Sequence, residues 1–160
     1  METDFRNIAG MFKANTDIVN RAITGVEPDA WFKTPGDDSN HLTWVLGHLI
    51  VHRGKALKML GVDWDNTWAE LFARGSERLA DTQYPSDEEM RSAWQEVSEQ
   101  LSAALKTPPE GVMTQEAPKD SLSFDGKMSG IVAFYAFHDT YHVGQVSFLR
   151  KWLGYGQTIG

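Results

Sequence analysis

Hydrophobic residues recur with the three-to-four-residue spacing of amphipathic helices in four parts of the chain, and strand-like alternation is missing. The four predicted helices span residues about 4–25, 40–60, 86–106 and 128–153. Ser86 with Glu89 forms a capping box, which predicts the start of the third helix. Gly25, Gly61 and Gly154 follow the other three patterns, and glycine is a common residue just after a helix end.

Four long amphipathic helices need one another to bury their apolar stripes, and a four-helix bundle is the simplest arrangement that does so. In the less regular segment 64–84, Trp64 to Phe72 could form a short extra helix over the bundle. Residues 107–126 read as a long loop, and loops of that length in compact domains are often functional. Without repeats or composition breaks, the sequence predicts a single all-α domain over residues 1–160.

The composition limits the classes of function. The chain has 160 residues, 41% of them hydrophobic and 23% charged, which is typical of a globular domain. A formal net charge of −7 argues against nucleic acid and against anionic membranes as partners. The absence of cysteine excludes disulfides, thiolate metal sites and a cysteine nucleophile. With no visible secretory signal and no apolar run of about 20 residues, we expect a soluble cytoplasmic protein.

The last predicted helix carries polar residues on its apolar face. His138, His142 and Gln145 interrupt a stripe that otherwise faces the core. Burying such groups costs a few kcal/mol each unless they find partners. Two histidines at positions i and i+4 lie one above the other, so one metal ion could satisfy both rings. The alternative is a pair of core histidines that are bonded to neighbouring side chains.

The second predicted helix carries the other three histidines, His41, His48 and His52, beside its apolar face. Two histidine-bearing faces that flank one core could meet. Three neutral imidazoles would leave an open coordination position, as catalytic metal sites do. Nitrogen ligands favour zinc, nickel, copper or iron over magnesium and calcium. Helical geometry alone does not choose among the three histidines, and a protein without metal stays a third interpretation.

Two motifs resemble the DinB-like family of damage-inducible four-helix-bundle proteins, which also includes the YfiT-like metal-dependent hydrolases. They are HLTWVLGHL at residues 41–49 and HDTYHVGQVSFLRKWLG at residues 138–154. Helix order and length agree as well, so the resemblance covers essentially the whole chain. It implies one divalent transition metal ion per chain, which would be zinc, nickel or iron, held by His48, His138 and His142.

The resemblance also bears on neighbouring residues. It implies that Gln145 lines the site, where its amide could orient water at the metal, and a helix–helix hydrogen bond is the alternative. Tyr141 would pack, donate a hydrogen bond to substrate, or do both. His52 could be a fourth ligand, a proton relay or a hydrogen-bonded flanking residue, and we expect the last. Asp139 points about 100° away from His138, so we expect a surface charge there.

The family's activities imply a metal-dependent enzyme that acts on a small molecule together with a low-molecular-weight thiol, of the S-transferase type. A metal-dependent hydrolase is the second expectation. The alternative is a non-catalytic interaction module that the metal stabilises. In either case we expect a homodimer.

Overall fold

The computed structural model describes residues 5–109 and 111–159, and it contains no strand within these ranges. The four long helices are α1 (Arg6–Ile23), α2 (Leu42–Met59), α3 (Asp87–Ala104) and α4 (Met128–Trp152). Two short 3₁₀ helices, η1 (Pro28–Phe32) and η2 (Asp81–Gln83), lie in the connections. The predicted all-α four-helix bundle is therefore confirmed, while the expected start of the first helix at Asp4 lies outside the described residues.

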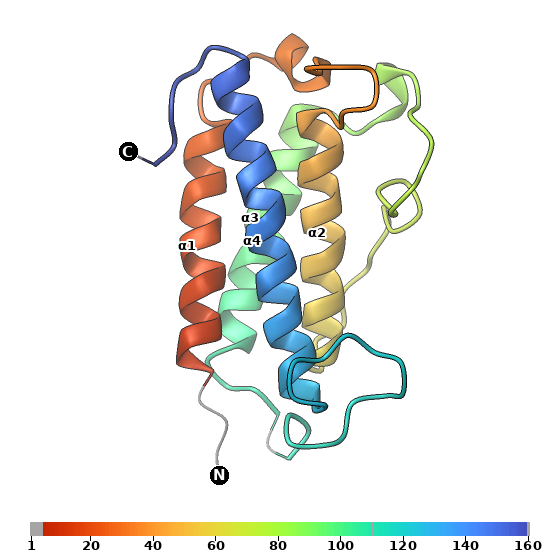
Figure 1. The fold of residues 1–160 in the computed structure, drawn as a ribbon, viewed down its shortest axis with the longest axis vertical. Helices are drawn as coiled ribbons and strands as arrows, with labels where there is room; N and C mark the ends of the chain where they lie inside the picture. The colour runs from red at the N-terminus through yellow and green to blue at the C-terminus, as the bar shows by residue number, and fades with distance from the viewer. Residues whose placement is uncertain (1–4, 110, 160) are drawn as a thin grey trace.

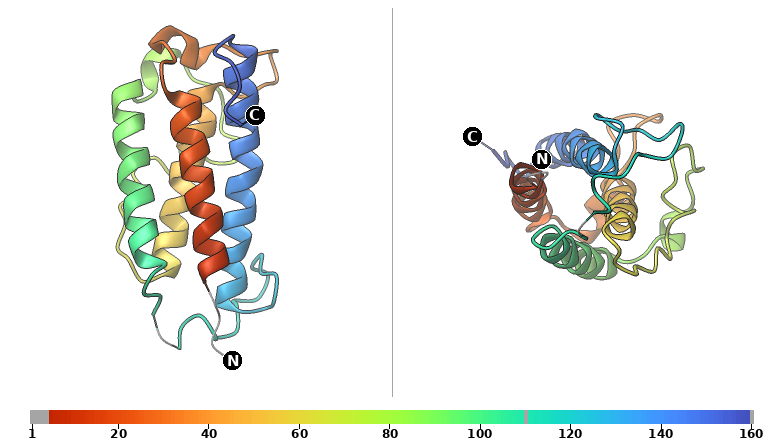
Figure 2. Two further views of the ribbon diagram at one scale, coloured as in Figure 1. Left: turned by 90° about the vertical axis from the view of Figure 1, so that its left-hand side faces the viewer. Right: turned by 90° about the horizontal axis from the view of Figure 1, so that it is seen from below.

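The helices surround a common core in the order α1, α4, α2, α3, as the end-on view in Figure 2 shows. In Figure 1, α1 and α4 run in one direction, and α2 and α3 run in the other. The connection from α2 to α3 therefore returns along the outside of α2 before α3 begins. This connection covers the face of α2 that a simple hairpin bundle would leave exposed to solvent.

The predicted helix ends follow local chemistry. The Ser86 hydroxyl accepts a hydrogen bond from the Glu89 amide at 3.2 Å, and the Glu89 carboxylate accepts one from the Ser86 amide at 2.8 Å. This reciprocal pair satisfies two amides that the first turn leaves free, and it confirms the predicted capping box. Gly25, Gly61 and Gly154 all have positive φ, between 70° and 89°, as helix-terminating residues commonly do.

The segment that was expected to form a short helix, Trp64 to Phe72, forms turns instead. Its backbone bonds include Ala69 N–H to Asn66 O at 2.9 Å, and its side chains pack against glycines of α2. A Cβ atom on Gly47 would overlap the ring of Phe72, and one on Gly54 would overlap that of Trp64. These contacts hold the segment against α2, and a regular helix does not form.

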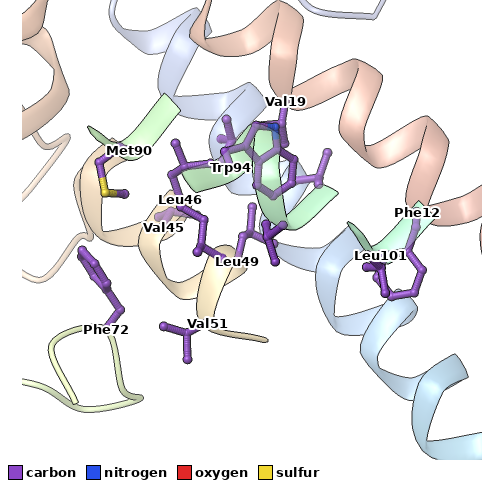
Figure 3. Packing of buried hydrophobic residues seen from close by; sticks show 14 of the residues in the cluster. Phe12, Val19, Val45, Leu46, Leu49, Val51, Phe72, Met90, Trp94 and Leu101 are labelled. Carbon is purple, nitrogen blue, oxygen red and sulfur yellow. The ribbon is translucent and has the colours of Figure 1, made fainter. Parts of the chain in front are cut away.

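The core draws on all four helices and on this connection. Figure 3 shows Phe72 on the loop side of α2 and Trp94 of α3 among the side chains of the bundle interior. Because α2 is enclosed from both sides, every residue from Leu42 to Val51 is buried. Helical periodicity puts both Trp94 and Trp152 on apolar stripes, but only Trp94 is a core residue, at 1% exposed, whereas Trp152 is 44% exposed. None of the described helices is long and apolar enough to cross a membrane.

Candidate metal centre

Three imidazoles from two helices meet between α2 and α4. His48 comes from α2, and His138 and His142 come from successive turns of α4. The Nε2 atom of His138 lies 3.3 Å from Nε2 of His48 and 3.1 Å from Nε2 of His142. The candidate ligand atoms of all three residues lie within 4.8 Å of one another. The structure thus brings together the three histidines that the family resemblance indicated.

The contacts of His48 orient its ring. Its Nδ1 lies 2.7 Å from the carbonyl oxygen of Phe72, which can only accept, so Nδ1 carries the proton and donates. The indole of Trp44 stacks on the same ring, with centroids 4.8 Å apart and planes inclined by 14°. Trp44 is itself fixed by a hydrogen bond from its Nε1 to the Ser76 hydroxyl at 2.9 Å. The lone pair of His48 Nε2 is consequently free and directed at the other two rings.

His142 is oriented in the same way by a different partner. Its Nδ1 donates to Oε1 of Gln145 at 2.7 Å, which again leaves the Nε2 lone pair free. Tyr141 packs its ring edge-on against His142, with centroids 5.0 Å apart, and is 61% exposed. Gln145 thus contacts a candidate ligand within its own helix, and Tyr141 lies at the rim where the site meets solvent.

Burial favours the neutral form of all three histidines. Burial lowers the pKa of His48 to about 4, and the hydrogen bond to Phe72 opposes this only in part. Burial, reinforced by the neighbouring His142 and His48, lowers the pKa of His138 to about 4. Burial also lowers the pKa of His142. Neutral imidazoles are the form that binds metal ions.

This arrangement fits a cation. The Nε2 atoms of His48 and His142 must be acceptors, because the Nδ1 atom of each ring donates its proton to an oxygen that only accepts. The Nε2 atom of His138 lies close to both. A single proton on His138 can satisfy only one of the two lone pairs, whereas a metal ion satisfies all three nitrogens at once. The Nδ1 atom of His138, which is buried, has no hydrogen-bond partner in the described part of the chain.

The remaining two histidines lie outside this group of three. His52 stacks on His138, with centroids 4.1 Å apart, and its buried Nδ1 has no partner among the described residues. This atom gives no support to the expected hydrogen-bonded flanking role, which stays a prediction. His41 forms the N-cap of α2, where its Nδ1 accepts a hydrogen bond from the Trp44 amide at 3.1 Å. Burial, together with the nearby Arg78, lowers the pKa of His41 to about 4, which keeps Nδ1 able to accept.

Asp139 is not the surface charge that its helical position suggested. It is 2% exposed and forms a two-point ion pair with Arg53 of α2, which is 1% exposed. Arg53 was not among the residues that the sequence predicted to be functional. The only signal in the sequence was that Arg53 is the one charged residue between Leu42 and Gly54 of α2. The carbonyl of Phe72 gave no sequence signal, because its position depends on how the connection folds back along α2. The stacking of Trp44 on His48 did have a signal, since the two residues are four apart in one helix.

The sequence of the chain matches one protein family. The sequence profile of the DinB superfamily matches residues 11–146, which include all of α2, all of α3 and the part of α4 that carries His138 and His142. No curated protein matches the chain.

Proposed function

The chain belongs to the DinB superfamily, and on this basis we propose that it binds one divalent transition metal ion through His48, His138 and His142. The observation that supports the proposal most directly is the convergence of three neutral imidazole nitrogens from two helices. Zinc, nickel and iron are the candidate ions, because imidazole nitrogen suits these metals and the chain offers no thiolate.

The same geometry supports an enzyme. Three protein ligands leave coordination positions for a small molecule, and the ion would act there as a Lewis acid. Gln145 would keep the His142 ring oriented through its hydrogen bond. Tyr141 has a largely exposed ring beside that ligand, and its hydroxyl would donate a hydrogen bond to a bound substrate. His138 and His52, which are both half-buried, mark the side from which a substrate would approach.

We propose a thiol-dependent transfer reaction of the S-transferase type as the first candidate activity, and a metal-dependent hydrolysis as the second. A low-molecular-weight thiol fits an open position on a soft or borderline ion, which lowers the pKa of a bound thiol. The alternative function is a non-catalytic module in which the ion links α2 to α4 and stabilises the bundle.

A homodimer is part of the proposal and is supported by the outer face of α4. Phe137, Tyr141, Phe148 and Trp152 follow one another along this face and are between 44% and 61% exposed. If each ring exposes roughly half of the ~200 Å² that an aromatic side chain can bury, the stripe amounts to about 400 Å². That is about half of the ~800 Å² that each partner contributes to a standard interface.

Elemental analysis by mass spectrometry tests the metal site, on protein that was purified without an affinity tag or added metal. We expect about one ion per chain in the wild type and none in His138→Ala or His142→Ala. His52→Ala is the matched control: it removes an imidazole that stacks on His138, and we expect it to retain the ion. If His52→Ala loses the ion while His48→Ala keeps it, the ligand assignment is wrong.

Turnover tests the two classes of function. The metal-loaded protein is incubated with a panel of low-molecular-weight thiols and an electrophile, and with a panel of esters. Thiol consumption that requires the metal supports the transferase, and ester cleavage supports the hydrolase. Absence of turnover with every thiol and ester supports the structural module.

A further inference from the structure

We infer that the buried Arg53–Asp139 ion pair holds α2 and α4 in the register at which the three histidines meet, so that metal affinity depends on two side chains that are not ligands. The inference rests on the proposed metal binding and adds a pair of positioning residues to it.

The geometry of the pair fixes both distance and angle. Arg53 Nε donates to Asp139 Oδ1 at 2.9 Å, and Arg53 Nη2 donates to Asp139 Oδ2 at 2.8 Å. Two parallel hydrogen bonds between a planar guanidinium and a planar carboxylate tolerate little sliding or rotation. Apolar contacts between two helices are non-directional and define the register less strictly.

The pair joins the two helices that carry the candidate ligands, and it does so close to them. Asp139 directly follows His138 in α4. Arg53 comes five residues after His48 in α2, which is about 7.5 Å along a helix axis. A shift of α2 against α4 that would separate His48 from His138 would therefore also break the two-point ion pair.

The surroundings leave Arg53 no freedom to follow such a shift. Its Nη1 donates to Thr16 of α1 and Ser98 of α3 at 2.8 and 2.7 Å, and its Nη2 also donates to the Phe12 carbonyl at 3.4 Å. The guanidinium lies 3.9 Å from the ring centroid of Trp94. All five N–H groups of Arg53 thus have partners, so it is not available to bind a substrate, and it connects all four helices.

Asp139 is also held by a residue of α1. The Asn15 amide of α1 donates to Asp139 Oδ2 at 2.9 Å and to the Thr140 hydroxyl at 2.9 Å. Buried ion pairs often contribute little net stability, because desolvation offsets their attraction, and apolar residues can replace them at small cost. Stability therefore does not explain why the chain buries an ion pair here, whereas a role in positioning the metal ligands does.

The test is the double variant Arg53→Met with Asp139→Leu, which replaces both charges by apolar side chains. We expect it to keep the helical circular dichroism of the wild type and to bind Zn²⁺ on the order of 10–100-fold more weakly, the range for groups that orient metal ligands. The visible absorption of bound Co²⁺ reports the ligand geometry directly, and we expect its bands to shift.

Arg150→Met is the matched control. Arg150 also ties α4 to α1, through hydrogen bonds from Nη1 to the carbonyls of Ala22 and Thr24 at 3.0 and 2.7 Å, but it is neither a neighbour of the histidines nor bonded to α2. We expect its Zn²⁺ affinity and Co²⁺ spectrum to match those of the wild type.

The outcomes distinguish the positioning role of Arg53 and Asp139 from the proposed metal site itself. If the double variant folds and binds Zn²⁺ with wild-type affinity, the inference is wrong and the metal site stands. If the wild type binds none of Zn²⁺, Co²⁺, Ni²⁺ and Fe²⁺, both are wrong. If the double variant does not fold, Asp139→Asn, which keeps the side-chain shape, is measured instead, and unchanged affinity and spectrum in that variant overturn the inference.

Discussion

Gly47 directly precedes His48, and Gly144 lies two residues after His142. Each glycine lowers helix propensity by about 1 kcal/mol relative to alanine. Their surroundings differ. A Cβ on Gly47 would overlap the ring of Phe72, whose carbonyl orients His48. A Cβ on Gly144 would meet no other described segment within 4 Å. Close approach of another segment therefore explains the glycine at position 47 and does not explain the one at position 144.

We predict that Gly47→Ala lowers the free energy of unfolding by about 1–3 kcal/mol, because the added methyl group overpacks a site where Phe72 is fully buried. Chemical denaturation measures this change. Gly10→Ala is the control, since Gly10 lies in α1 with nothing near its Cβ position, and we expect it to raise stability by up to about 1 kcal/mol. Equal effects of the two substitutions would contradict the prediction.

The element that carries most of the chemistry is α4, which presents three different faces. One face holds His138, His142 and Gln145 toward α2, and another packs on α1. The third exposes an aromatic stripe with Gly144 at its middle. The stripe is arranged almost symmetrically about this glycine, so two antiparallel copies of α4 could cross there with aromatic rings facing each other.

We predict that the wild type is a dimer by light scattering and that Phe148→Glu makes it monomeric, because a carboxylate would be desolvated within the interface. Phe148 is 58% exposed in the single chain, so we expect the substitution to leave the fold intact. Met11→Glu is the control, since Met11 is 42% exposed on α1, and we expect it to remain dimeric. A wild type that stays monomeric at all concentrations contradicts the prediction.

For the whole molecule, an ion held by α2 and α4 couples metal binding to folding. A ligand that binds only the folded chain stabilises it by about 2.7 kcal/mol when its free concentration is 100 times its Kd. The protonation of the site sets the pH range of this effect. Burial lowers the pKa of His48 and of His138 from 6.5 to about 4, so both stay neutral in the folded chain at pH values where an exposed imidazole is protonated.

We predict that saturating Zn²⁺ at pH 7 raises Tm by roughly 5–10 °C relative to protein with a chelator, as a few kcal/mol does in a domain of this size. As the pH falls from about 6.5 toward 4, the unfolded chain takes up protons that the folded site does not, so the metal-free protein loses stability. Calorimetry across this range checks both effects. An increase in Tm that persists unchanged at pH 4 would contradict the assigned ligands, because protonated imidazoles do not bind metal.

The sequence by itself determined the four helices, the Ser86 cap and the glycine stops, because these depend on periodicity and on contacts a few residues apart. It also determined that His138 and His142 share a face, and the family motif singled out His48 from its neighbours. Helical geometry placed Asp139 at the surface, because that argument assumes that a helix has only one buried face. In the structure, α4 buries Asp139 against Arg53 while the adjacent face holds the histidines.

Only the tertiary structure decided which groups complete the site. The connection from α2 to α3 folds back along α2, and this alone brings the Phe72 carbonyl to His48 and Ser76 to Trp44. The same packing buries Arg53 beside Asp139 and leaves His52 stacked on His138 without a partner for its Nδ1. These contacts join residues that are far apart in the sequence, and hydrophobic periodicity carries information only about which side of an element is buried, not about what it meets there.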